Sequence, residues 1–278
     1  MDCLARNAVL SARVEKTLPC VVWLLLLFLV GGCGPSSEDR RFMRRLNSGT
    51  VADRLKAMAE TPRPADAAIR TELLRIFENG QESPLIRSSA GITLGGLHDA
   101  RIVPAAMKQL PDSILNLGKL ERNRRMEPYL LGKALAAYGP EALPEVAALL
   151  RDPRREVVTW AIMHHGSYRH SDRAYEVLAR YLNDRDIFYR RAAAFGLSMV
   201  AHPQAEALVA LHLGDVDAEV RYNLAWALLN YGSSLSLRSV EAQLVVEKEP
   251  GVRQELTKAL AIIKSRPVLP PPPALRKP

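Results

Sequence analysis

Three closely spaced histidines are the first residues of this 278-residue sequence that could do chemistry. His164, His165 and His170 lie in the segment HHGSYRH, and clustered imidazoles can bind zinc or copper. Only Asp172 lies close enough in sequence to add a carboxylate, and Gly166 interrupts the helix that would fix the spacing of the imidazoles. We therefore expect solvent-facing turn histidines, with no bound metal and no cofactor.

Other catalytic patterns are missing from the sequence. It contains no Gly-x-Ser-x-Gly elbow, no phosphate-binding Gly-x-x-x-x-Gly-Lys loop and no His-Glu-x-x-His helix. Cys3 and Cys20 lie in the N-terminal leader, so Cys33 is the one thiol expected in the mature chain. We expect no catalytic residues and no enzyme activity.

Cys33 follows a segment that is typical of bacterial export. Residues 21–30 are ten consecutive apolar residues, too short to span a bilayer and suited to the core of a signal peptide. Residues 30–33, Val-Gly-Gly-Cys, resemble a bacterial lipobox. The resemblance implies a lipoprotein signal peptide at 1–32 and a lipidated Cys33, because several acyl chains give durable anchoring. The alternative is an ordinary membrane anchor with an incidental cysteine.

The residues after Cys33 bear on localisation. Residues 33–45 are expected to hold the lipidated cysteine and a tether, and the basic run RRFMRR at 40–45 could attract anionic lipid. Gly34 stands where an aspartate would resemble a retention signal for the inner membrane. We expect a lipid-anchored protein of the bacterial cell envelope, at the periplasm-facing outer membrane rather than the inner membrane.

A repeated helical unit would position the remaining residues. In the segment 220–232, VRYNLAWALLNYG, apolar residues recur every three or four positions, which predicts a helix. Asp217 is the candidate N-cap, and Gly232 is expected to end the helix in a left-handed conformation. Arg190, Arg221 and Arg253 mark the same position in successive units, 31 and 32 residues apart, with a second helix between each pair. This period is typical of an α-solenoid.

The pattern resembles the HEAT-like repeats of the phycobilisome-lyase type. The shared features are Asp-Pro before Val-Arg, an Ala-rich first helix, and a second helix that ends in Asp. The resemblance implies an all-α fold, a right-handed α-solenoid of about six helical pairs over residues 46–265. We also expect an insertion at about 112–127 and a Pro-rich disordered tail at 266–278. Pro270–273 favour polyproline II, so the tail could also be a stiff spacer or a ligand for an aromatic groove.

Two sets of side chains in the first helices have alternative interpretations. The arginines at the shared repeat position could bind anions in a row, or pair with turn aspartates in a ladder along the stack. We favour the ladder, because the aspartates recur with the same period; the arginines are Arg87, Arg190, Arg221 and Arg253. Trp160, Phe195 and Trp226 are interpreted as core residues rather than a stacking platform.

The resemblance implies that the second helices line the concave face. Its expected contact residues are Lys108, Gln109, Arg173, Glu176, Arg180, Gln204, His212 and Gln243. The insertion adds a basic cluster, Lys119, Arg122, Arg124 and Arg125. Exposed inserted loops on solenoids often contact partners.

Charge narrows the class of partner. The net charge is +8, and residues 1–32 contribute only +1 of it. A basic exported chain favours anionic partners and makes nucleic acid an improbable one. We expect a monomeric, lipid-anchored scaffold that binds a protein partner in the cell envelope through its concave face. The alternatives are a bilin-lyase-like enzyme that holds a tetrapyrrole and its acceptor, or a basic binder of anionic glycan or lipid.

Overall fold

The computed structural model describes residues 37–115 and 127–266. These residues form fourteen α-helices and two short 3-10 turns, without a strand among them, which confirms the all-α prediction. The signal peptide, Cys33, the basic cluster of the insertion and the tail from residue 267 lie outside the described residues. The helices are α3 (Ser37–Leu46), α4 (Val51–Ala59), α5 (Ala67–Glu78), α6 (Pro84–Gly96), α7 (Ile102–Leu115), α8 (Glu127–Tyr138), α9 (Leu143–Ala148), α10 (Arg155–His165), α11 (Asp172–Leu182), α12 (Ile187–Met199), α13 (Ala205–His212), α14 (Ala218–Tyr231), α15 (Leu237–Val246) and α16 (Pro250–Ser265).

Side-chain caps start several of these helices where the sequence predicts. The Asp217 carboxylate accepts a hydrogen bond from the Val220 N–H at 3.0 Å, and Asp186 caps α12 in the same way. The end of α14 differs from the prediction, because Gly232 has φ −59° and is not left-handed. Glycine is needed there for space, since a Cβ would lie 2.6 Å from the Leu228 carbonyl oxygen.

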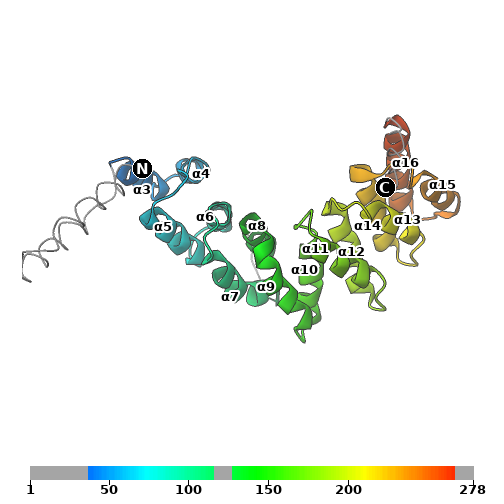
Figure 1. Cartoon of the computed structure of the whole chain (residues 1–278), viewed down its shortest axis with the longest axis horizontal. Coiled ribbons are helices and arrows are strands. Elements are labelled where there is room, and N and C mark those ends of the chain that lie inside the picture. The colour runs from blue at the N-terminus through cyan, green and yellow to red at the C-terminus, as the bar shows by residue number, and fades with distance from the viewer. Residues whose placement is uncertain (1–36, 116–126, 267–278) are drawn as a thin grey trace, which may run out of the picture.

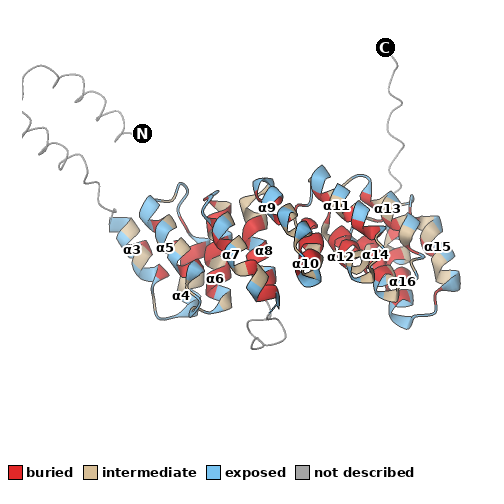
Figure 2. Ribbon diagram, turned by 90° about the horizontal axis from the view of Figure 1, so that it is seen from below, coloured by how far each residue is buried: buried red, intermediate tan, exposed pale blue. Residues whose placement is uncertain are grey.

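The helices form two rows with the apolar core between them. The even-numbered helices make one row, in which α6 packs on α8, α10 on α12, and α14 on both α12 and α16. The odd-numbered helices make the second row, and each packs mainly on its even-numbered neighbours. Buried residues gather where the two rows meet (Figure 2). This stack of helical pairs is the predicted α-solenoid, and its right-handed sense stays a prediction.

The two rows differ in which side of the curved stack they occupy. The chain bends into an open V, with α6 and α8 on the inner side of one arm and α14 and α16 on the inner side of the other (Figure 1). The prediction that the second helices line the concave face was therefore wrong, because these are the odd-numbered helices. The inner row of an arc has less space per helix, and small residues allow the closer packing. A Cβ on Gly95 of α6 would lie 2.6 Å from the Ala134 carbonyl oxygen of α8.

The solenoid begins earlier than the expected tether allows. Residues 37–45, assigned to the tether, are helical in α3, and Phe42 and Leu46 are buried. These two side chains are four residues apart on one helix face, so they reach the core together. At the insertion, α7 continues to Leu115 and buries Ile114.

The core consists of two clusters that meet at α10. One cluster runs from Phe42 to Ala174 and the other from Val158 to Ile263. Between α8 and α10 the space is filled by two large side chains of α10, Trp160 and His164. A Cβ on Gly132 of α8 would lie 2.5 Å from the His164 ring.

Candidate binding surface on the inner row

Three of the four arginines at the shared repeat position form ion pairs between repeats, as the ladder interpretation predicts, but only Arg190 pairs with a turn aspartate. Arg253 instead donates to the Leu244 and Glu247 carbonyl oxygens. Arg221 makes two hydrogen bonds to Glu247, at 2.7 and 2.8 Å, and also donates to the Asp215 carbonyl oxygen at 2.8 Å. Arg190 pairs in the same way with Asp215, one repeat earlier. Each carboxylate follows the next odd-numbered helix, so the ion pairs join successive repeats. The arginines are therefore satisfied within the fold and are not a row of free anion sites.

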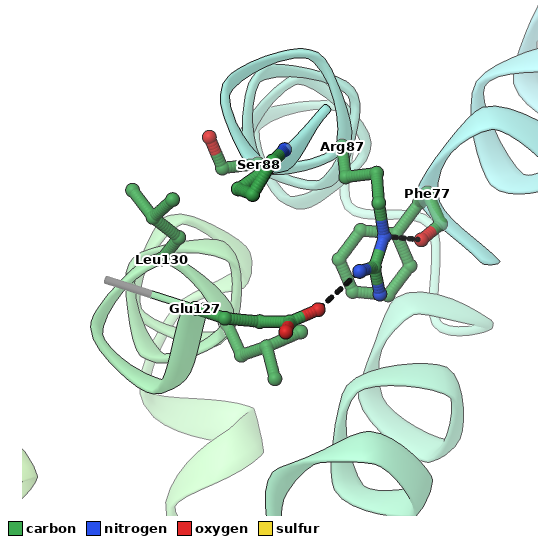
Figure 3. A pocket seen from close by; sticks show the side chains of 7 residues that line it. Phe77, Arg87, Ser88, Glu127 and Leu130 are labelled. Atoms are coloured by element: carbon green, nitrogen blue, oxygen red, sulfur yellow. Dashed lines mark hydrogen bonds and ion pairs between the residues drawn. The ribbon is translucent and has the colours of Figure 1, made fainter. Parts of the chain in front are cut away.

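Arg87 shows the same arrangement at the other end of the stack. Its Nε donates to the Phe77 carbonyl oxygen at 3.1 Å, and its guanidinium contacts Glu127 (Figure 3). The guanidinium also contacts Gln109. The Arg87 side chain is only 8% exposed. The small pocket beside it has room for about one water molecule. This pocket is a structural joint between repeats rather than a site for a larger ligand.

The ladder changes the ionisation of its carboxylates. Hydrogen bonds from the Arg221 guanidinium lower the pKa of Glu247 to about 2, from an ordinary value of 4.5. The Glu247 side chain is 1% exposed. An isolated buried carboxylate would be protonated instead, so the pairing with Arg221 keeps this charge inside the fold.

The histidine cluster lies in a different environment from the one expected. His164 and His165 belong to α10 and are buried, while His170 is exposed in the following turn. The expectation of solvent-facing turn histidines was wrong for the first two, because α10 continues through His165. Burial lowers the pKa of His164 to about 3 and also lowers the pKa of His165. Within residues 37–115 and 127–266, no three potential metal ligands lie together.

The expected contact residues lie on the outer row, and some of them are engaged within the fold. Gln109 contacts Arg87, His212 bonds to Asn183 at 3.0 Å, and Gln243 donates to Glu247 at 2.9 Å. Lys108, Arg173, Glu176, Arg180 and Gln204 are exposed. A partner-binding role for these residues stays a prediction, as does any role for Lys119, Arg122, Arg124 and Arg125.

Large apolar side chains are exposed on the inner row instead. We call three of them, together with the half-buried Phe195 beside them, the aromatic patch; its residues on the adjacent helices α12 and α14 are Phe188, Phe195, Tyr222 and Trp226. Phe188 is 43% exposed, Tyr222 40% and Trp226 38%. The rings of Phe195 and Trp226 are 5.9 Å apart, between their centroids.

The tryptophan prediction was right for Trp160 and wrong for Trp226. Trp160 is 6% exposed and belongs to the core, whereas Trp226 is at the surface. The signal that could have separated them is the repeat register. Trp226 and Phe195 each follow a ladder arginine by five residues, as does the exposed Ile92 of α6. Trp160 does not occupy this repeat position, because α10 has no arginine at the ladder position.

A charged side chain contacts the aromatic patch, and another charged group lies on the same helices. The Arg155 guanidinium lies over the Phe188 ring, 4.2 Å from its centroid. Arg191 pairs with Asp217 and Glu219, each at 2.7 Å. Exposed aromatic rings beside arginines, on helices fixed by a core, are typical of non-covalent recognition of another chain.

Comparisons with known proteins agree with the repeat pattern over part of the chain. The model of the family described as HEAT repeats matches residues 176–261, so this region consists of HEAT repeats. No curated protein matches the sequence. Among solved structures, the CpcE–CpcF complex of phycocyanin lyase from Nostoc sp. PCC7120 is 20% identical and covers 55% of this chain and 98% of that chain, with a TM-score of 0.44.

Two further solved structures are similar over more of the chain. Human deoxyhypusine hydroxylase in complex with glycerol is 18% identical, covering 82% of this chain and 96% of that chain, with a TM-score of 0.34. A designed armadillo repeat protein in complex with the peptide (KR)4 is 17% identical, covering 80% and 98%, with a TM-score of 0.39.

Proposed function

We propose that this chain, whose residues 176–261 are HEAT repeats, is a binding scaffold that holds a protein partner against its inner row of helices. The observation that carries the proposal is the aromatic patch. Large rings exposed on a rigid surface lose little conformational entropy on binding, and Trp, Tyr and Arg dominate binding energy at interfaces.

The position of the patch also favours this function. Its four residues come from two neighbouring helices of the inner row, which pack directly on one another and bury Ala192, Ala194 and Ala225. A partner segment that crosses α12 and α14 would contact rings from successive repeats. Repeat proteins use such extended surfaces for binding.

We further propose that the scaffold works at the cell envelope, anchored through a lipidated Cys33. The support is the lipobox-like sequence after a ten-residue apolar core. The outer membrane, facing the periplasm, is favoured over the inner membrane because Gly34 follows the cysteine. The chain would act as a monomer, without a cofactor and without enzyme activity.

Site-specific photo-cross-linking in cells tests the binding surface. A photoreactive phenylalanine analogue replaces Tyr222 or Trp226 on the inner row, and replaces Lys108 or Glu176 on the outer row as a matched control. We expect one discrete cross-linked protein from the inner positions and none from the outer ones. Cross-links from the outer positions alone would support the second-helix surface and contradict the proposal.

Chemical analysis of the N-terminus tests the anchor independently. We expect the mature chain to begin at an acylated Cys33, and Cys33→Ser to lose both the fatty acid and the membrane attachment. An intact leader with an unmodified thiol would refute the lipid anchor while leaving the inner-row surface untouched. A tetrapyrrole absorbance titration of the same preparation tests the lyase-like alternative, for which we expect no spectral shift.

A further inference from the structure

The described chain ends beside the C-terminus of α14, the helix that carries Tyr222 and Trp226 of the aromatic patch. Arg266 follows α16, and its guanidinium donates to the Leu229 carbonyl oxygen at 2.8 Å and to the Asn230 carbonyl oxygen at 3.2 Å. It also contacts the Gly232 carbonyl oxygen. These carbonyls end α14, the helix that carries Trp226 one turn earlier. The residues after Arg266 therefore start beside the C-terminal end of α14.

The remaining chain is long enough to cover the patch. Residues 267–278 are twelve residues, PVLPPPPALRKP, and an extended polyproline II chain spans about 3.1 Å per residue, or about 37 Å in all. From Tyr231, which ends α14, back to Tyr222 is about two and a half helical turns, or roughly 14 Å. The four consecutive prolines begin four residues after Arg266, so they reach the rings of α14 and α12.

The chemistry of the two surfaces is complementary. Polyproline II segments dock in aromatic-lined grooves, because proline rings pack flat on indole and phenol rings and the segment is already extended before binding. Phe195 and Trp226 lie at 50° to one another, with Tyr222 four residues from Trp226 on the same face of α14. Proline is the residue that such tilted rings accept at low entropic cost.

We propose that Pro270–273 of the C-terminal tail dock on the aromatic patch of the same chain. The tail then occupies the binding surface in the absence of a partner, and the partner that displaces it is itself a proline-rich, extended segment. This inference rests on the proposed function, because it names the class of segment that the inner row binds.

The fluorine spectrum of the full chain labelled with 5-fluorotryptophan tests the docking. The Trp226 signal is assigned by its loss in Trp226→Phe, and its shift between H2O and D2O reports exposure. The tail variant carries Pro270→Ser, Pro271→Ser, Pro272→Ser and Pro273→Ser. We expect its Trp226 shift to increase about twofold, with the buried Trp160 unchanged as an internal control. An equal Trp226 shift in both chains would overturn the proposal.

A synthetic peptide of residues 267–278 tests the same contact from outside. A tethered segment acts at a millimolar effective concentration, so the peptide should bind the tail variant about tenfold more tightly than the wild type. It should not bind the tail variant that also carries Trp226→Ala. Docking within one chain would be contradicted if the peptide bound the wild type and the tail variant with equal affinity. It would also be contradicted if the protection of Trp226 depended on protein concentration. Cross-linking from Tyr222 could still succeed in that case, so the proposed function would stand.

Discussion

His164 is a base enclosed by other rings. Its imidazole stacks on the Trp160 indole at 4.6 Å between centroids and meets the Tyr168 ring edge-on at 5.6 Å. Its Nε2, the Trp160 Nε1 and the Tyr168 hydroxyl have no hydrogen-bond partner within the described residues. Because a protonated imidazole would lose its hydration in this layer, His164 must be neutral when the chain is folded.

This burial predicts a loss of stability in mild acid. The unfolded chain binds a proton at His164 below about pH 6.5, whereas the folded chain resists protonation until about pH 3. The free energy of unfolding should therefore fall as the pH drops from 6.5 to 3, by about 1.4 kcal/mol per pH unit for this residue. His164→Leu should remove that part of the slope in urea melts between pH 7 and 4. His170→Gln is the control, because it also removes a histidine from this segment but one that is exposed in the turn.

The Arg221–Glu247 pair makes a second prediction for single residues. Arg221→Met leaves the Glu247 carboxylate buried without its partner and should cost about 3 kcal/mol of unfolding free energy. Changing both residues to methionine should cost less than the sum of the single changes, with a coupling of about 1–3 kcal/mol. Arg191→Met is the matched control, since that side chain is 33% exposed and should cost under about 1 kcal/mol. Additive effects for Arg221 and Glu247 would show that the ladder does not join the repeats.

The arginine ladder and the N-terminal helix caps could be predicted from the sequence, whereas the burial of His164 could not. The positions of Arg221 and Asp217 recur with the repeat period, so the cap and an ion pair between repeats follow from spacing, although the partner of Arg221 is Glu247 rather than a turn aspartate. His164 occupies a position where other repeats have smaller residues, and the residues that surround it come from α8 and the turn after α10. A contact between residues so far apart in the chain leaves no local signal.

The helices are fixed largely by local signals, and the differences occur where tertiary contacts decide. Most boundaries follow caps and apolar spacing, as for α14. The α3 helix was missed because its polar sequence has only Phe42 and Leu46 as buried anchors. The wrong choice of concave row has the same origin, because helical spacing shows that two rows exist but not which one has the smaller radius.

Glycines at the contacts between helices of the inner row allow a test of how closely neighbouring helices pack. A Cβ on Gly166, at the end of α10, would contact the backbone of Gly196 in α12. Gly166→Ala should therefore separate the two helices and cost about 2–3 kcal/mol. Gly251 in α16 has nothing within 4 Å of an added Cβ, so Gly251→Ala should stabilise the chain by about 0.5 kcal/mol. Thermal melts of the two variants should shift in opposite directions; shifts of the same sign would contradict close packing at Gly166.

Across the whole molecule, the contact between α8 and α10 makes the solenoid divisible. Helices of the inner row pack directly on their neighbours along each arm, but α8 and α10 are joined through the Trp160 and His164 side chains. Solenoid stability is approximately a sum of repeat stabilities and interfaces between neighbours. The weakest interface therefore determines where the stack separates, and the unpartnered polar atoms of Trp160 and His164 place it between α8 and α10.

The two tryptophans outside the leader can report this separation, because one lies at the contact that opens and the other lies away from it. Trp160 fills the contact between α8 and α10, which we call the seam, and Trp226 belongs to the C-terminal arm. In the chain from residue 33, Trp226→Phe leaves emission from the seam, and Trp160→Phe leaves emission from the arm. We expect the emission of Trp160 in the seam to change at a lower urea concentration than the emission of Trp226 in the arm. The expected gap between the two midpoints is about 1 M, since interfaces of a few kcal/mol separate independent units.

Gly132→Ser, which crowds the His164 ring, should lower the urea midpoint of the seam transition and leave the midpoint of the arm transition in place. Coincident transitions in both reporters would mean that the solenoid unfolds as one cooperative unit and that the contact between α8 and α10 is as strong as any other.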